Sequence, residues 1–140
     1  MTYNSILDNW TKNHYDSAMD FKSITLKEFE NAINQKDKPV IVDFWAISSI
    51  ACGMYKERLD IAHEQLADYA LFGSVEIEKL PELTERFSII TIPTTLIFYK
   101  GEIAKQYMGI QEPETLFAAI EDITGKKIKL PEKEEEFVEE

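Results

Sequence analysis

Cys52 is the single cysteine of this 140-residue chain, and its thiol is the side chain best suited to covalent chemistry. Ser49 precedes it by three positions, and Asp43 lies upstream within an apolar run. Thiol–disulfide exchange needs one thiolate to attack and a second thiol to release the mixed disulfide. Because a serine hydroxyl takes neither role, a complete dithiol cycle within this chain is excluded, and so is an internal disulfide.

Hydrolytic and metal chemistry find little support among the other polar residues. A nucleophilic serine needs an adjacent base, but His14 and His63 lie outside the segment around Ser49, which has no nucleophile-elbow pattern. Ser49 is therefore interpreted as a helix N-cap. One cysteine and two scattered histidines give no metal-ligand spacing, so we expect neither a metal nor a cofactor. Met54 and Met108 are interpreted as packing residues.

Composition limits the partners and the compartment. A net charge of −11 disfavours nucleic acid, because phosphate binding needs clusters of Lys and Arg. No segment has the apolar length of a membrane span, and residues 1–5 lack the basic start and apolar run of a secretory signal. A single cysteine fits a reducing compartment. We therefore expect a cytoplasmic, one-domain protein without nucleic-acid or membrane partners.

Alternating helices and strands are expected to position the residues named above. Residues 25–28 match a capping box, and Phe29 and Ile33 continue an apolar helical stripe. Residues 40–46 form the nearly continuous apolar run of a central strand, and a helix is expected to begin after Ser49.

The second half of the chain continues this alternation. Its predicted elements are a strand over 70–78, a helix from Pro81 to Phe87, hairpin strands 95–99 and 103–108, and a helix from Pro113 that ends at Gly125. Residues 21–24 are compatible with a short first strand. Such alternation implies right-handed crossovers and a layered α/β domain, which we place at residues 22–125.

Two segments flank this domain. Residues 1–21 have helical apolar spacing, carried by Tyr3, Leu7, Trp10, His14 and Ala18. Docking of this N-terminal helical extension on its own domain is favoured over docking on a partner, because an exposed aromatic stripe promotes aggregation. Residues 126–140 are expected to form a solvated, acidic C-terminal tail.

Four features stand in a fixed order along residues 22–124. They are Val42-Asp43-Phe44-Trp45-Ala46, Ile92-Pro93-Thr94, Gly101 in the hairpin and Gly109 after the last strand. Together they resemble the thioredoxin family. The resemblance implies a thioredoxin fold, an α/β architecture with a central mixed sheet and helices on both faces. It also implies that Asp43 is a buried acid beneath the active site, that Pro93 is a cis-proline, and that the Ile92 backbone lines a groove for a substrate peptide.

Cys52 can be aligned with the family's Cys-Gly-Pro-Cys motif in two ways. If Cys52-Gly53-Met54-Tyr55 begins the motif, Cys52 is the attacking thiol, but gaps are needed and Arg58 and Gln65 turn inward without evident partners. The ungapped alignment places Ser49-Ile50-Ala51-Cys52 on the motif. The inward face of its helix is then an amphipathic stripe of Cys52, Tyr55, Leu59, Ala62 and Leu66. The ungapped alignment is favoured, because the gapped one would bury the charge of Arg58 and the amide of Gln65 at a desolvation cost.

In the ungapped alignment the substitutions fall on the catalytic positions. Ser49 replaces the attacking cysteine, Ser48 the preceding tryptophan, Ile50-Ala51 the Gly-Pro pair, and Ser74 a lysine that the family often keeps near the buried acid. Asp43 is then either a proton relay or a residual buried acid, and the sequence favours neither. Cys52 is interpreted as a small packing residue.

Two functional hypotheses follow from this resemblance. In the first, the protein is a thioredoxin-like chaperone or adaptor, not an enzyme, that binds a protein or extended peptide in the cis-proline groove; the sequence specifies no oligomeric state. The expected groove residues are Trp45, Ser48, Ile50, Ile92 and Pro93. In the alternative, a monothiol protein of cell redox homeostasis, Cys52 forms a mixed disulfide that an external thiol resolves; a helix N-terminus favours its thiolate. The changes at Ser48 and Ile50-Ala51 favour native divergence over a disabling substitution at Ser49.

Overall fold

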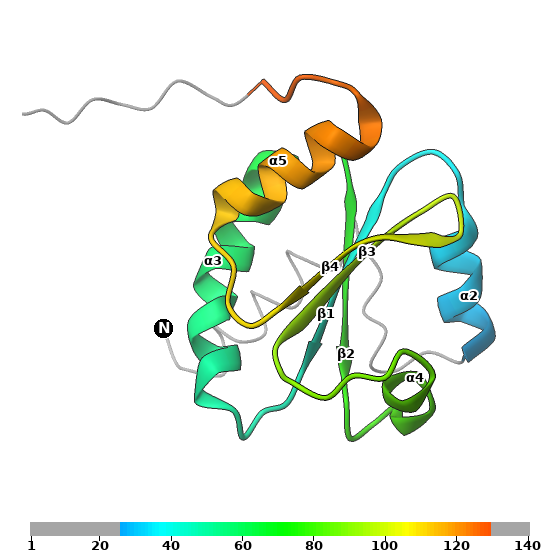
Figure 1. Cartoon of the computed structure of the whole chain (residues 1–140), viewed down its shortest axis with the longest axis vertical. Helices are drawn as coiled ribbons and strands as arrows, with labels where there is room; N and C mark the ends of the chain where they lie inside the picture. The colour runs from blue at the N-terminus through cyan, green and yellow to red at the C-terminus, as the bar shows by residue number, and fades with distance from the viewer. Residues whose placement is uncertain (1–25, 130–140) are drawn as a thin grey trace, which may run out of the picture.

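The computed structural model describes residues 26–129, which form a four-stranded sheet between two layers of helices (Figure 1). The elements are α2 (Leu26–Asn34), β1 (Val40–Trp45), α3 (Ile50–Leu66), β2 (Leu71–Glu76), α4 (Pro81–Arg86), β3 (Thr94–Tyr99), β4 (Glu102–Met108) and α5 (Pro113–Thr124). The strand order is β2-β1-β3-β4; β1 is parallel to β2 and antiparallel to β3, which is antiparallel to β4. This mixed sheet with helices on both faces confirms the predicted fold.

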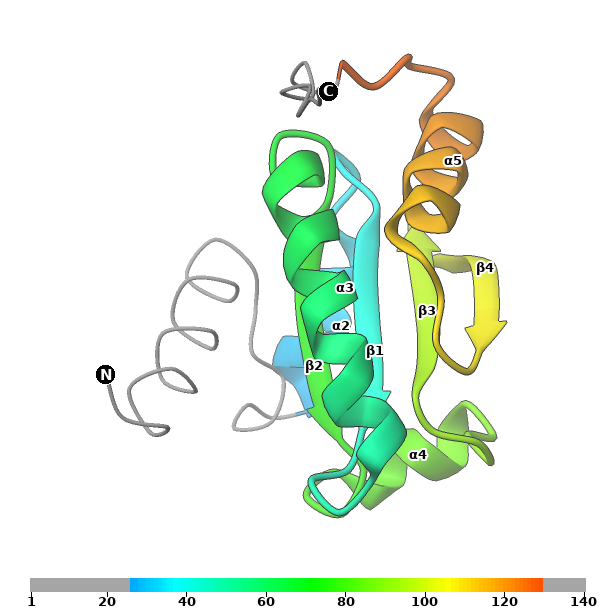
Figure 2. The ribbon, with the colours of Figure 1, turned by 90° about the vertical axis from the view of Figure 1, so that its left-hand side faces the viewer.

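Strand β1 lies inside the sheet and separates two hydrophobic cores. Side chains alternate between the faces of a strand, so Ile41 joins the core beneath α3 and α5, whereas Val42 and Phe44 join the core beneath α2 and α4. Figure 1 shows these helix pairs on opposite sides of the sheet, and Figure 2 shows α3 running alongside β1. Burial on both faces explains the continuous apolar run in the sequence.

Two glycines end elements with backbone angles that suit glycine. Gly101, in the β3–β4 hairpin, has φ +86°, and a Cβ at this position would lie 2.7 Å from Oδ1 of Asn34. Gly125 has φ +71° and donates its N–H to the Glu121 carbonyl at 2.8 Å. The left-handed conformation at Gly125 closes α5 at the residue predicted from sequence.

The segment after α5 returns to the core. Ile128 is buried in the cluster beneath α3 and α5, and its N–H donates to Oε2 of Glu121 at 2.9 Å. The Lys129 N–H donates to the Tyr69 hydroxyl at 3.2 Å. Ordered packing therefore continues past Gly125, where the charged tail was predicted to begin. The predicted N-terminal helix, the strand near 21–24 and residues 130–140 lie outside the described residues.

Strand β2 is shorter than the strand predicted over 70–78. Residues 77–79 form a turn, in which the N–H groups of Lys79 and Leu80 donate to the Glu76 carbonyl at 2.9 and 3.3 Å. Glu76 itself is buried, because it lies on the α3 face of the sheet with Phe72 and Ser74. Within residues 26–129 no helix is long and apolar enough to cross a membrane.

Candidate functional site

The junction between β1 and α3 carries the degenerate motif. Ser49 has an extended backbone, with φ −91° and ψ 121°, and its Oγ accepts a hydrogen bond from the Cys52 N–H at 3.2 Å. This bond satisfies one of the amides that the start of a helix leaves without an intrahelical partner. The predicted N-cap is confirmed, and the Ser49 hydroxyl is engaged in holding the first turn of α3.

Cys52 begins the buried face of α3 and is 8% exposed. The buried residues of this helix are Cys52, Tyr55, Leu59, Ala62 and Leu66, as the ungapped alignment predicts. Arg58 lies on the outer side, where its Nε is 3.0 Å from Oε2 of Glu112 on the loop before α5. The gapped alignment, which turns Arg58 inward, is therefore wrong.

Asp43 is buried beneath this junction, opposite Ser74 in the β1–β2 register. Neither Oδ1 of Asp43 nor Oγ of Ser74 hydrogen bonds to another protein group in the described part of the chain. Burial disfavours the charged carboxylate and raises the pKa of Asp43 to about 7. Asp43 is therefore an acid that changes charge near neutral pH inside the core.

Tyr55 and Thr95 form a buried polar contact beside Asp43. The Tyr55 hydroxyl and Thr95 Oγ1 are 2.7 Å apart and share a hydrogen bond. Burial raises the pKa of Tyr55, and the Asp43 carboxylate adds to the rise. Thr95 was not among the predicted site residues; its position opposite Asp43 in the β1–β3 register is the signal that identifies it.

The loop before β3 faces the same end of the sheet. Its Ile92–Pro93 peptide bond is cis, as the resemblance implies. The Thr94 hydroxyl donates to the Thr91 carbonyl, and the Gly109 N–H donates to the Pro93 carbonyl at 2.8 Å. Ile92 precedes the β3 register, and its backbone makes none of the turn or loop hydrogen bonds found in residues 26–129.

The predicted groove residues meet at this end of the sheet. Trp45 ends β1 and is half-buried, Ser48 is exposed in the following turn, and Ile50 begins α3 with 82% of its surface exposed. Pro93 is buried behind the half-buried Ile92. Because Thr94 pairs with Phe44, the loop carrying Ile92 and Pro93 lies beside the end of β1.

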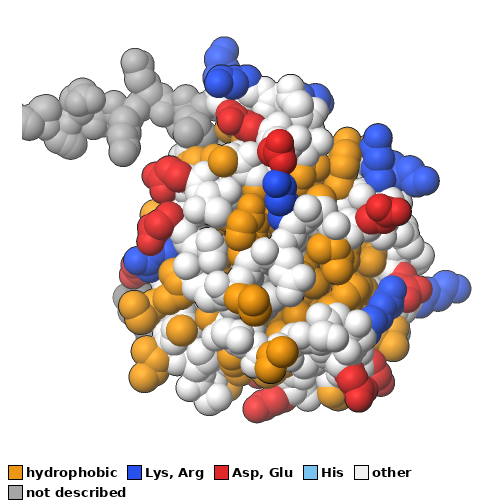
Figure 3. All heavy atoms as spheres, in the orientation of Figure 1, with side chains coloured by type: hydrophobic (Ala, Val, Ile, Leu, Met, Phe, Trp, Pro, Cys, Tyr) orange, Lys and Arg blue, Asp and Glu red, His pale blue; other side chains and the backbone are white. Residues whose placement is uncertain are grey.

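Exposed apolar side chains lie on the segments next to these residues, and we call them the apolar rim. The rim consists of Ile47, Ile50, Met54, Ile90 and Met108. Ile90 is 89% exposed. The interpretation of Met54 and Met108 as packing residues is wrong, because both residues are exposed, Met54 on the outer side of α3 and Met108 at the end of β4. Figure 3, in the orientation of Figure 1, shows exposed hydrophobic side chains over the lower part of the view, where β1 ends and α3 begins.

The residues in the described range do not assemble a metal site. No group of three or more His, Cys, Asp or Glu side chains within residues 26–129 is arranged to hold a metal ion. His63 packs edge-on against Phe72, with ring centroids 5.0 Å apart. His14 lies outside the described residues.

The sheet order, the cis-proline loop and the β1–α3 junction define a thioredoxin-fold protein whose motif position carries Ser49 and Cys52. The thioredoxin family model matches residues 20–122, and the chain belongs to the thioredoxin family.

Thioredoxins of known sequence and structure share this domain. The chain is 38% identical over 101 residues to thioredoxin from Alicyclobacillus acidocaldarius, covering 72% of this chain and 95% of the relative. It is 30% identical over 107 residues to thioredoxin from Mycobacterium tuberculosis, covering 73% and 91%. Thioredoxin from Trypanosoma brucei brucei has the same fold, with a TM-score of 0.70, 19% identity and coverage of 80% and 95%. The oxidised form of mitochondrial thioredoxin 3 from Saccharomyces cerevisiae also has this fold, with a TM-score of 0.66 and 24% identity. The match covers 78% of this chain and 98% of the yeast protein.

Proposed function

We propose that this protein is a binding member of the thioredoxin family, a chaperone or adaptor that holds an extended peptide or protein segment beside Ile92 and Pro93 without a disulfide. The observation that carries the proposal is the apolar rim around a backbone segment that takes no part in the sheet. A peptide strand can pair with such a segment and bury its own apolar side chains against the rim.

The energetic argument rests on the exposed isoleucines of the rim. Burial of apolar surface contributes roughly 25 cal/mol per Å², so leaving Ile47, Ile50 and Ile90 in water forgoes stability that a partner would supply. Large apolar side chains that gather on one face mark interaction sites more often than isolated ones do. The rim therefore supports binding of an apolar segment at this end of the sheet.

The Ser49 and Cys52 side chains support a mode of binding that needs no thiol. The Ser49 hydroxyl caps α3, and Cys52 lies on the buried face of the same helix. A thiol must be reached by its partner and ionised to exchange disulfides. Limited access to Cys52 favours a noncovalent complex.

A monothiol function is the second candidate, because the relatives matched over most of their length are thioredoxins. In this function the Cys52 thiolate attacks oxidised glutathione or a client disulfide and releases one thiolate as the leaving group. An external thiol then attacks the mixed disulfide and restores Cys52. The burial of Cys52 on the inward face of α3 opposes access to its thiol.

Binding of a reduced, unfolded polypeptide whose cysteines are blocked by alkylation separates the two functions. We expect binding that is unchanged by reductant and by Cys52→Ala, and that is lost in the double variant Ile50→Asp/Ile90→Asp. Ile61→Asp is the matched control, because Ile61 is an exposed isoleucine of α3 that lies outside the rim.

Two results would overturn the binding proposal. The first is no binding by the native protein or equal loss in the Ile61→Asp control. The second is binding only to a polypeptide with free cysteines that disappears with reductant and with Cys52→Ala, which establishes the monothiol function instead. Circular dichroism of each variant verifies that the substitutions at these exposed positions leave the fold intact.

A further inference from the structure

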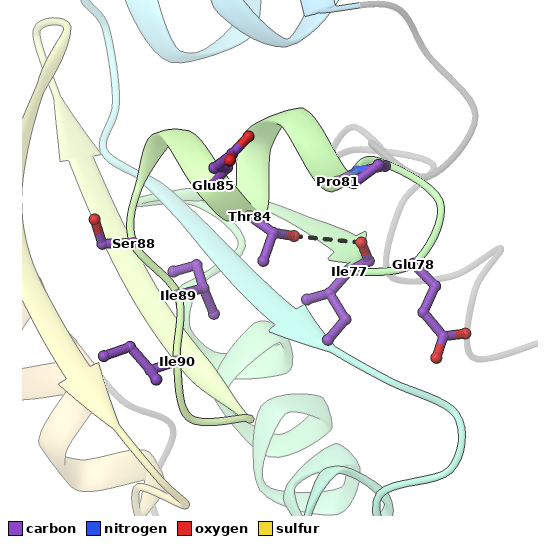
Figure 4. Close-up of a pocket in the computed structure, with 8 residues that line it drawn as sticks. All are labelled: Ile77, Glu78, Pro81, Thr84, Glu85, Ser88, Ile89 and Ile90. Carbon is purple, nitrogen blue, oxygen red and sulfur yellow. Dashed lines mark hydrogen bonds between the residues drawn. The ribbon is translucent and has the colours of Figure 1, made fainter.

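A pocket beside the cis-proline loop lies outside the groove predicted from sequence. It has a volume of about 720 Å³ and is formed by the β2–α4 turn, one side of α4 and the loop that leads to β3. Its lining residues are Ile77, Glu78, Pro81, Thr84, Glu85, Ser88, Ile89 and Ile90 (Figure 4). This volume falls within the range of roughly 300–1,000 Å³ that is usual for ligand pockets.

The centre of the pocket is apolar. Figure 4 shows Ile77, Thr84 and Ile89 next to one another between the ends of the pocket. The Thr84 hydroxyl lies 3.3 and 3.4 Å from the carbonyl oxygens of Ile77 and Leu80 and donates its one proton to this pair of acceptors, so this polar atom is already engaged within the protein. An aliphatic side chain suits this centre, because it requires no hydrogen bond from it.

The margins of the pocket are acidic. Glu78 and Glu85 are exposed and make no ion pair within residues 26–129. In Figure 4, Glu78 lies at one end of the pocket beyond Ile77, and Glu85 lies on α4 beside Thr84. Arg86, the basic residue of α4, is bound to Glu30 and lies over the Phe87 ring. Lys79 belongs to the β2–α4 turn but does not line the pocket. The field over the pocket therefore favours a cation.

The pocket continues directly from the peptide groove. Ile90 belongs both to the apolar rim and to the pocket, and it precedes Ile92 by two residues. A peptide strand advances about 3.3 Å per residue. A strand that lies beside Ile92 therefore reaches the pocket about two residues further along its own sequence.

From this geometry we propose a sequence preference, which rests on the binding function proposed above. The peptide held beside Ile92 inserts an aliphatic side chain between Ile77 and Ile89. Lys or Arg residues two positions before and after that side chain lie on the same face of the strand and reach toward Glu78 and Glu85. The partner is thus an extended segment with an aliphatic residue between basic ones, and it needs no cysteine.

Three labelled, cysteine-free peptides test this preference by fluorescence anisotropy at low ionic strength. They are identical except at three alternate positions among their five central residues. These positions hold Lys, Ile and Lys in the first peptide, Glu, Ile and Glu in the second, and Lys, Ser and Lys in the third, and each peptide is named here by these three residues. We expect the Lys-Ile-Lys peptide to bind at least about tenfold more tightly than the other two. Added salt should narrow its advantage over Glu-Ile-Glu, because screening shortens the reach of exposed charges.

Charge reversal in the protein identifies the site. Glu78→Lys/Glu85→Lys should remove the preference for Lys-Ile-Lys, whereas the control Glu64→Lys/Glu114→Lys makes the same change in net charge at exposed acids of α3 and α5 and should retain it. Equal losses in both double variants, or equal binding of the three peptides, would overturn the proposed preference. If the three peptides bind equally and their binding is lost in Ile50→Asp/Ile90→Asp, the sequence preference is overturned but the binding function stands. If neither the peptides nor the unfolded polypeptide bind, the preference and the binding function are both overturned.

Discussion

The Tyr55 hydroxyl on α3 lies 2.7 Å from the Thr95 hydroxyl on β3, inside the core between helix and sheet. This contact fixes the first turns of α3 against the strand that follows the cis-proline loop. It joins the two halves of the candidate site, because Tyr55 follows Cys52 by one helical turn and Thr95 follows Pro93 by two residues.

Tyr55→Phe should lower the free energy of unfolding by about 1–2 kcal/mol, because the substitution leaves the buried Thr95 hydroxyl without its partner. Thr95→Val should lower the free energy of unfolding less in the Tyr55→Phe background than in the native protein, since the double variant leaves no unpaired polar group of this contact. Urea denaturation of the two single variants and the double variant measures this coupling. Additive losses would contradict the energetic importance of the contact.

Asp43 should make stability depend on pH. Its pKa is raised from 3.8 to about 7 in the folded state, so the folded protein holds this proton more tightly than the unfolded chain does. The stabilisation is complete below pH 3.8 and is lost as the pH rises through about 7. The total loss is on the order of 4 kcal/mol.

Asp43→Asn should remove most of the decrease in unfolding free energy with rising pH, because the asparagine side chain is neutral at every pH. Above pH 7 we therefore expect the variant to be more stable than the native protein, measured by urea unfolding across pH 4 to 8. Asp68→Asn, at an exposed acid, is the control that should retain the native slope. Parallel profiles for the native protein and Asp43→Asn would show that Asp43 does not titrate in this range.

Ser49→Cys should create disulfide reductase activity that the native chain lacks. A cysteine at the N-cap acquires a lowered pKa from the helix dipole, and Cys52 lies close enough to resolve a mixed disulfide. Insulin reduction driven by a thioredoxin-reducing system measures this gain. The native protein and Ser49→Cys/Cys52→Ala should stay at background; turnover by the native protein at the rate of an ordinary thioredoxin would refute the assignment of Ser49 to the attacking position.

Cys52 should react slowly with a thiol reagent in the native state. Its side chain is 8% exposed on the inward face of α3, so a reagent gains access chiefly when the helix opens. We expect labelling in denaturant to be at least about a hundredfold faster than in native buffer. Native labelling at the denatured rate would support the monothiol function.

The sequence by itself determined the elements and their inward faces. Hydrophobic periodicity is a local property, so the stripe from Cys52 to Leu66, the apolar run of β1 and the end of α5 at Gly125 were predicted without knowledge of neighbouring segments. The Ser49 cap belongs to the same class, because a cap bonds to amides within its own first turn. The motifs around Asp43 and Pro93 identified the family from their order and spacing.

Only the tertiary structure decided what covers each side chain. Tyr55 and Thr95 are forty residues apart in sequence, and their contact depends on how α3 packs on β3. The exposure of Ile90 and Met108 depends on the absence of a covering segment in the described structure, which no local pattern encodes. The pKa of Asp43 follows from burial by several elements together, since desolvation is a property of the whole surrounding and not of the residue.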